Sequence, residues 1–234
     1  MKPYQIILCC FGGVALLITL IVVMVLFAPR REDNNAPQYV SQPKYSIQVI
    51  DDVMTAEECV ILREAARPNM FKSAVYSSDQ DIEDTNTRIS EQCWLQESST
   101  PVVKTFRQRI RRLIPKLSRR AHLEQVQVVR YQPGGFFTPH YDACVGSKEF
   151  CHRMDKPHGP RYITVLLYLS DGDATTGGET VFPRIGQSVT PKVGRVVIFY
   201  NINKQRSIIE EALHGGQPVL RGEKWIANQW IRIW

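Results

Sequence analysis

The sequence is poor in several features that define common protein classes. Its 234 residues include no internal repeat and no low-complexity tract. About 190 residues remain when the apolar N-terminal run described below is set aside, and this length suits one globular domain with a full core. None of the six cysteines lies in a CxxC pattern of the kind that binds zinc. Two further absences are local: residues 6–28 carry no charge, and residues 101–123 contain no acid.

The uncharged run reads IILCCFGGVALLITLIVVMVLFA and is 23 residues long, whereas about 20 helical residues cross a bilayer core. The apolar region of a secretory signal is shorter, about 7–15 residues, and Leu26 stands where cleavage requires a small residue. We therefore expect an uncleaved single-pass anchor over residues 6–28, after a short tail over residues 1–5. A buried core helix is the alternative, but the run has no polar face.

The charges beside this run leave its orientation open. Lys2 precedes it and Arg30 and Arg31 follow it, so the positive-inside rule is nearly balanced. Residues 29–44, PRREDNNAPQYVSQPK, are polar and contain proline, which predicts a short stalk. The folded domain is expected over residues 45–234.

Four cysteines lie in this domain: Cys59, Cys93, Cys144 and Cys151. An even number is compatible with two disulfides in an oxidising compartment. Buried free thiols are the alternative, and the spacing does not decide between them.

The order of the predicted elements indicates an α+β fold. A strand and a helix are expected near residues 46–67, where Thr55 and Glu58 form a capping-box pattern. A second helix is expected from Thr100, because Pro101 suits a first helical position and apolar residues follow at helical spacing. After Leu123 come short β-rich runs separated by Gly, Pro and Asp. We predict a jelly-roll core, a double-stranded β-helix, with supporting N-terminal helices.

The acid-free stretch over residues 101–123 holds eight Lys or Arg, although the whole chain has a net charge of only +6. The basicity is therefore one local patch. It suits nucleic acid, anionic lipid or an acidic partner. A simple solvated helix face is the preferred interpretation, since no nucleic-acid-binding motif accompanies it.

One short motif points to metal chemistry. His140 and Asp142 lie two positions apart in RYQPGGFFTPHYD, and residues at this spacing in a strand share a face. His214 lies far along the chain, as expected where distant strands become neighbours in a jelly roll. Together the three residues would form a 2-His-1-carboxylate triad, the site of non-haem Fe(II) oxygenases. Lys224, ten residues after His214, would supply a cation for the far carboxylate of 2-oxoglutarate.

These residues lie in motifs that resemble the prolyl 4-hydroxylase family of Fe(II)/2-oxoglutarate-dependent dioxygenases. The resemblance runs from about residue 45 to 234 and is densest in YQPGGFFTPHYD, RYITVLLYLSD, GGETVFP and LHGGQPVLRGEKW. It implies iron ligation by His140, Asp142 and His214. It also implies a group of residues at the 2-oxoglutarate pocket: Lys224, Thr180, Tyr131 and Trp230.

The resemblance further implies a substrate and a cellular setting. Arg161 and Arg88 resemble residues on the peptide-binding side, and Phe137 stands where the family often has Tyr, so the fit of the substrate is open. The implied reaction hydroxylates peptidyl proline to 4-hydroxyproline and decarboxylates 2-oxoglutarate to succinate and CO2, with O2, Fe(II) and ascorbate as reductant. The implied form is short, membrane-anchored and type II, with a lumenal catalytic domain in the endoplasmic reticulum or Golgi.

Other functions remain open from the sequence. A related 2-oxoglutarate oxygenase would act on another amino acid, or on a nucleobase gripped by the basic helix. A zinc hydrolase would use the triad but not Lys224. A catalytically inactive jelly roll would serve as a membrane-anchored binding module. The oligomeric state is also open.

Overall fold

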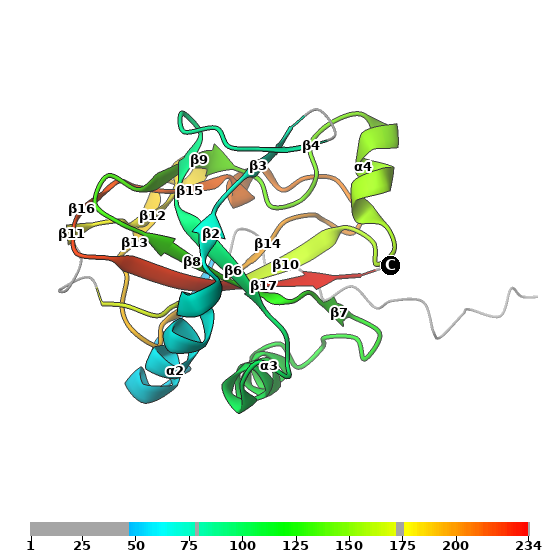
Figure 1. Ribbon diagram of the computed structural model, residues 1–234. Helices are drawn as coiled ribbons and strands as arrows, with labels where there is room; N and C mark the ends of the chain where they lie inside the picture. Colours follow the sequence, from blue (N-terminus) through cyan, green and yellow to red (C-terminus); the bar gives the residue numbers. More distant parts are fainter. Residues whose placement is uncertain (1–46, 78–79, 172–175, 234) are drawn as a thin grey trace, which may run out of the picture. The chain divides into compact units, whose positions relative to one another are not determined.

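The computed structural model describes residues 47–77, 80–171 and 176–233 (Figure 1). No helix within these ranges is long and apolar enough to cross a membrane. The predicted tail, anchor and stalk over residues 1–44 lie outside the described residues.

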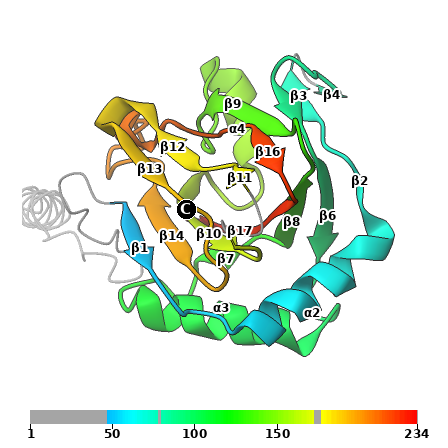
Figure 2. The ribbon, with the colours of Figure 1, turned by 90° about the vertical axis from the view of Figure 1, so that its left-hand side faces the viewer.

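Two antiparallel sheets make up most of the described chain (Figures 1 and 2). Among the described residues the larger sheet has eight strands, in the order β1-β14-β10-β17-β8-β6-β2, with β7 beside β17. Its strands are β1 (Gln48–Ile50), β2 (Phe71–Lys72), β6 (Glu91–Leu95), β7 (His122–Leu123), β8 (Val126–Tyr131), β10 (Arg161–Tyr168), β14 (Val196–Tyr200) and β17 (Lys224–Arg232).

The smaller sheet has five strands within the described ranges, in the order β13-β12-β15-β9-β5. They are β5 (Arg88–Ile89), β9 (Phe136–His140), β12 (Thr180–Phe182), β13 (Gln187–Val189) and β15 (His214–Gly216). Two two-stranded pairs lie outside both sheets: β3 (Val75–Ser77) with β4 (Gln80–Ile82), and β11 (Thr176–Gly177) with β16 (Val219–Arg221). Because the two sheets face each other, as Figure 2 shows, the architecture confirms the expected α+β jelly roll.

Two helices cover the outer face of the larger sheet (Figure 2). Helix α2 (Ala56–Ala66) begins with the predicted capping box: Glu58 N–H donates to Thr55 Oγ1, and Thr55 N–H donates to the Glu58 carboxylate. Helix α3 (Pro101–Leu113) begins after Thr100, with Pro101 in the predicted first position. A third helix, α4 (Lys148–Asp155), lies between β9 and β10 in the sequence.

The basic patch divides into two kinds of residue. Arg109 binds the Glu58 carboxylate through both terminal nitrogens, and Arg107 binds Glu97 and Gln229. These two arginines fix α3 to its neighbours. The other basic residues of the helix are exposed, and no residue of α3 lines the central cavity.

The core consists of two apolar clusters on the two faces of the larger sheet. Strand β10 supplies both, because successive side chains alternate between faces. Ile163, Val165 and Leu167 belong to the cluster beneath the helices, and Leu166 and Tyr168 belong to the cluster between the sheets. The functional residues also lie between the sheets.

The sequence left disulfides and buried free thiols as alternatives for the four cysteines, and both occur. Cys144 and Cys151 form a disulfide, whereas Cys59 and Cys93 are buried free thiols. Burial raises the pKa of the Cys59 thiol to about 11, so this thiol stays protonated near neutral pH.

Candidate active site

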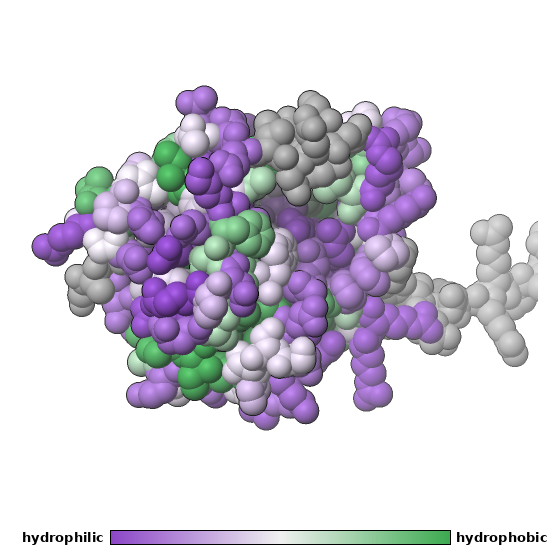
Figure 3. Space-filling model, in the orientation of Figure 1, coloured by the Kyte–Doolittle hydropathy of each residue, from purple (hydrophilic) through white to green (hydrophobic). Residues whose placement is uncertain are grey.

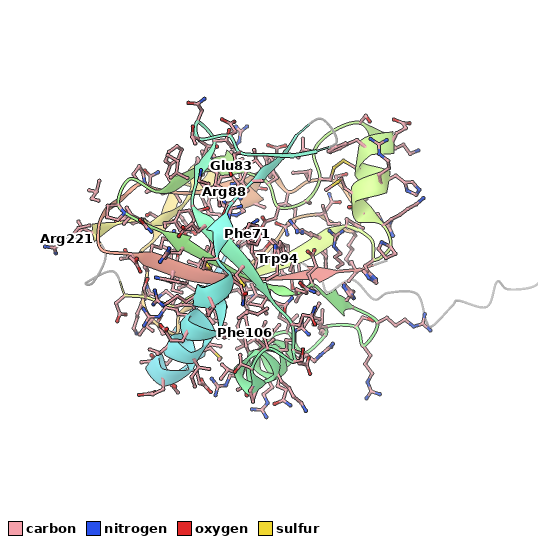
Figure 4. All side chains as sticks on the ribbon, viewed as in Figure 1. Phe71, Glu83, Arg88, Trp94, Phe106 and Arg221 are labelled. Carbon is pink, nitrogen blue, oxygen red and sulfur yellow. A yellow bond between two sulfur atoms is a disulfide. The ribbon has the colours of Figure 1, made fainter. Side chains whose placement is uncertain are left out.

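A cavity of about 880 Å³ lies between the two sheets. Its walls include both sheets, the β2–β3 region and the segment that carries α4. The face in Figure 3 is hollowed near its centre, and Figure 4 shows Phe71, Arg88 and Trp94, which line the cavity, on this same side. The cavity contains every site residue predicted from the sequence: Tyr131, His140, Asp142, Thr180, His214, Lys224, Trp230, Arg88 and Arg161.

Strand pairing brings the two predicted histidine ligands together. Strands β9 and β15 are antiparallel neighbours, and His140 is the direct partner of His214. Asp142 follows in a bend two residues after His140. One ligand atom from each of the three residues lies within 4.8 Å of the others, and no second such group occurs in the described part of the chain.

Both imidazoles are held in one tautomer. His140 Nδ1 lies 2.8 Å from the Thr138 carbonyl, and His214 Nδ1 lies 2.9 Å from the Ala212 carbonyl. A carbonyl only accepts hydrogen bonds, so each Nδ1 carries the proton and each Nε2 presents a lone pair. The Nε2 atoms lie 3.9 Å and 3.7 Å from the Asp142 carboxylate oxygens.

The charge states suit a divalent cation. Burial, with a contribution from His214, lowers the pKa of His140 to about 3. Burial alone would raise the pKa of Asp142, but His214, His140, Arg161 and the Thr164 hydrogen bond together hold that pKa below its usual value. At neutral pH, His140 is therefore neutral and Asp142 is ionised, and these are the forms that ligate metal.

A buried cation occupies another part of the same cavity. Lys224 begins β17 and is 2% exposed, and its cross-strand partner is Tyr131. Its ammonium lies 5.2 Å from the Tyr131 ring, and no acceptor among the described residues bonds to it. Burial lowers the pKa of Lys224 to about 7, while Glu179 opposes the shift. A buried ammonium without an acceptor is a site for an anion.

Thr180 lies near this cation through a contact that the sequence did not reveal. Its hydroxyl accepts a 2.7 Å hydrogen bond from the Tyr168 hydroxyl, and Tyr168 also contacts the Lys224 ammonium through its ring. Gly178 leaves space for the lysine stem, because a Cβ there would lie 3.2 Å from Lys224 Cδ. Its φ of +77° also favours glycine.

Trp230 lies elsewhere in the cavity. It stands six residues after Lys224 on β17, about 20 Å along the strand at about 3.3 Å per residue. Arg161 stacks on it, with the guanidinium carbon 3.5 Å from the ring centroid. Trp230 therefore lies well away from Lys224 along the strand, although the resemblance placed both residues at the 2-oxoglutarate pocket. Its Nε1–H is buried and has no partner among the described residues.

The two predicted substrate-side arginines are fixed by different contacts. Glu124, which the sequence did not reveal, binds Arg161 through both carboxylate oxygens at 2.8 and 2.9 Å. Arg88 is 8% exposed and donates to Ser90 Oγ at 2.8 Å. Its guanidinium also lies over the Phe137 ring.

Phe137 is a further contact that only the fold reveals. Its ring stacks on His140 with centroids 3.6 Å apart and planes 17° apart. Phe137 therefore touches both the metal-binding cluster and Arg88.

Comparisons with known proteins agree with this geometry. Residues 126–232 match the model of the 2OG-Fe(II) oxygenase superfamily. A putative prolyl 4-hydroxylase of Acanthamoeba polyphaga mimivirus is 32% identical over 202 residues, covering 86% of this chain and 80% of the relative. Human prolyl 4-hydroxylase subunit alpha-1 is 32% identical over 222 residues, and the matched region covers 88% of this chain but only 39% of that protein.

A solved structure extends the likeness to the fold. The viral collagen prolyl hydroxylase of Paramecium Bursaria Chlorella virus-1, determined as a 2OG complex, superposes with a TM-score of 0.65 at 29% identity. The match covers 82% of this chain and 98% of the viral protein. The chain therefore belongs to the prolyl 4-hydroxylase family of Fe(II)- and 2-oxoglutarate-dependent oxygenases.

Proposed function

We propose that this protein hydroxylates peptidyl proline to 4-hydroxyproline while it converts 2-oxoglutarate and O2 to succinate and CO2. One observation carries the proposal: the His140, Asp142 and His214 ligand atoms lie within 4.8 Å of one another in the cavity that also holds the buried Lys224 ammonium. A metal triad beside a buried cation suits an oxygenase with a dicarboxylate co-substrate. A zinc hydrolase has no use for Lys224.

The family uses Fe(II), 2-oxoglutarate and O2, and ascorbate is typical of it. In our proposal His140 Nε2, His214 Nε2 and the Asp142 carboxylate hold the iron. A 2-His-1-carboxylate set leaves positions open for co-substrate and oxygen. When bound, the iron supplies the oxidative chemistry, and the protein orients the reactants and excludes water.

Lys224 binds the far carboxylate of 2-oxoglutarate in this proposal. The ammonium is buried and has no acceptor among the residues that the structure describes, so the carboxylate relieves an existing desolvation cost. Thr180 and Tyr131 complete the pocket with hydroxyl groups. Hydrogen bonds between a charged carboxylate and these donors fix the co-substrate in one orientation.

The peptide occupies the other part of the cavity, beside Arg161, Arg88 and Trp230. Arg161 is held in place by Glu124, and the Trp230 Nε1–H, which has no partner in the described part of the chain, is a donor suited to a peptide carbonyl. Phe71 and Val145 place exposed apolar surface at the rim, which suits proline rings. The basic patch of α3 does not line the cavity, so no observation favours a nucleobase substrate.

The test is succinate release from 2-oxoglutarate with a panel of proline-rich peptides, with and without Fe(II). Peptide-stimulated release together with hydroxyproline in the product supports the function. His140→Ala, Asp142→Ala and His214→Ala are each expected to abolish iron-dependent turnover, because each removes one of three ligands. Release that no peptide stimulates, or release that does not require Fe(II), contradicts it.

We also propose a type II anchor over residues 6–28, a stalk over residues 29–44 and a catalytic domain over residues 45–234 in the lumen of the endoplasmic reticulum or Golgi. The uncharged run and the Cys144–Cys151 disulfide support this, because disulfides persist in oxidising compartments. Protease treatment of sealed microsomes is expected to leave the domain intact. Digestion from the cytosolic side contradicts this orientation.

A further inference from the structure

The Asp142 carboxylate is held by a chain of two hydrogen bonds that begins in the larger sheet. The Thr164 hydroxyl, on β10, donates to Asp142 Oδ2 at 2.6 Å. The Asn201 side-chain amide, just after β14, donates to Thr164 Oγ1 at 2.9 Å. Thr164 and Asn201 are each 1% exposed, so both bonds are shielded from water.

The donor and the acceptor in each of these two hydrogen bonds follow from the hydrogen-bonding capacity of each group. An ionised carboxylate only accepts, so the single Thr164 hydroxyl proton points to Asp142. Thr164 Oγ1 must then accept, which turns the Asn201 –NH2 group toward it. The price is visible at the other end of the amide: Asn201 Oδ1 is buried and has no partner among the described residues. An orientation that leaves a buried acceptor unpaired indicates a role for the opposite end of the side chain.

The backbone holds Asn201 rigidly. Its N–H donates to the Tyr162 carbonyl at 2.8 Å, and its own carbonyl accepts from Ile209 N–H at 3.0 Å. Asp142, by contrast, follows β9 in a bend and pairs with no strand among the described residues. The two histidines already have supports in the Thr138 and Ala212 carbonyls. The Thr164 hydroxyl is the corresponding support for the carboxylate.

We propose that Thr164 and Asn201 are positioning residues that orient Asp142 for metal binding. The Thr164 hydrogen bond to Oδ2, the oxygen 3.7 Å from His214 Nε2, fixes the rotation of the carboxylate and turns Oδ1 toward His140 Nε2, 3.9 Å away. This inference rests on the proposed function, because it assumes a metal at the triad. The proposal gives a role to two residues that neither line the cavity nor belong to the three metal ligands.

The test measures Co(II) affinity of the full-length apoprotein in detergent, by visible absorption and without turnover. Thr164→Val keeps the shape of the side chain but removes the hydroxyl, and we expect Co(II) binding about 10- to 100-fold weaker, as for other supports of metal ligands. Thr164→Ser restores the donor and is expected to recover wild-type affinity. Asn201→Ala is expected to weaken binding less, because it acts one bond further away, and it provides the answer if Thr164→Val does not fold.

Ile163→Val is the matched control. It lies on the same strand but faces the apolar core, so it lowers stability without touching Asp142. We expect its Co(II) affinity to equal that of the wild type. Wild-type Co(II) affinity in folded Thr164→Val or in folded Asn201→Ala, with His214→Ala unable to bind, overturns the positioning role alone. Equal Co(II) binding in the wild type and in His214→Ala instead overturns the metal site and the proposed function.

Discussion

At the scale of single residues, burial gives the site its chemistry. The same burial lowers the pKa of His140 and of Lys224, whose ammonium has no acceptor within the described ranges. Neither residue would be unusual on the surface. Between two sheets, the neutral imidazole becomes a ligand and the ammonium becomes a receptor for an anion.

Lys224→Ala should raise the KM for 2-oxoglutarate far more than it weakens metal binding. A charge-assisted hydrogen bond contributes about 1.5–3 kcal/mol, and the unpaired carboxylate adds a further cost. At about 1.4 kcal/mol per tenfold, we expect a loss of tens- to hundreds-fold in co-substrate affinity. Lys224→Arg should rescue only in part, because a planar fork does not replace a point charge. Unchanged 2-oxoglutarate kinetics at saturating Fe(II) and peptide would refute the assignment.

The pKa of Lys224 also predicts a pH dependence. Its pKa of about 7 without co-substrate means that the ammonium loses its proton as pH rises above that value. A dicarboxylate prefers the protonated form, so 2-oxoglutarate affinity should fall by up to about tenfold per pH unit above pH 7. Titration of co-substrate binding to Mn(II)-loaded protein between pH 6 and about 9 measures this. Lys224→Arg stays charged, so its affinity for 2-oxoglutarate should depend little on pH. If that affinity fell with pH as steeply as in the wild type, Lys224 would be excluded as the titrating group.

At the scale of elements, the segment with α4 is a wall of the cavity held by few buried contacts. Helix α4 has no buried residue, although Phe150 and Met154 line the cavity. The Cys144–Cys151 disulfide ties the helix to the stretch that follows Asp142. Arg232 adds contacts to the Met154 and Gly159 carbonyls.

Reduction of this disulfide to two thiols by a dithiol should loosen the wall. Binding must then order the segment, at about 1 kcal/mol, so the KM for peptide should rise about fivefold. Decarboxylation of 2-oxoglutarate without peptide should not change, because the Lys224 side of the cavity lies in the sheets. The double variant Cys144→Ser/Cys151→Ser should show the same KM and no further response to the dithiol. Full reduction, verified by thiol labelling, without a change in peptide KM would disprove this role.

At the scale of the whole molecule, the site joins the two sheets. His140 and His214 belong to the smaller sheet, while Lys224 and the Thr164 support for Asp142 belong to the larger one. A bound metal and co-substrate would therefore connect both sheets across the cavity.

Bound ligands should accordingly raise the melting temperature. Each ligand at 100 times its Kd adds about 2.7 kcal/mol, or about 5–10 °C for a domain of this size. Thermal unfolding with Mn(II), and then with Mn(II) and 2-oxoglutarate, should show two successive increases. Lys224→Ala should keep the first increase and lose most of the second, and His214→Ala should lose both. A second increase of wild-type size in Lys224→Ala would contradict the proposed contact.

The sequence by itself determined the periodic and local features of this protein. The capping box at Thr55 and Glu58, the Pro101 helix start and the β-rich second half follow from short-range chemistry. The HYD motif, with His214 and Lys224 at their spacings, was enough to predict that the three candidate ligands come together and that Lys224 lines the same cavity.

Only the tertiary structure decided the contacts that join distant segments. Glu124 lies 37 residues from Arg161 in the sequence, and Asn201 lies 37 residues from Thr164. The structure also decided which cysteines pair: Cys144 binds Cys151, whereas Cys59 and Cys93 stay free. The position of Trp230 beside Arg161, away from Lys224, also depends on strand length and register. No periodicity encodes such pairs, because strand order and register across two sheets set them. The one sequence signal, a threonine within the apolar run of β10, becomes meaningful when the fold places Asp142 above it.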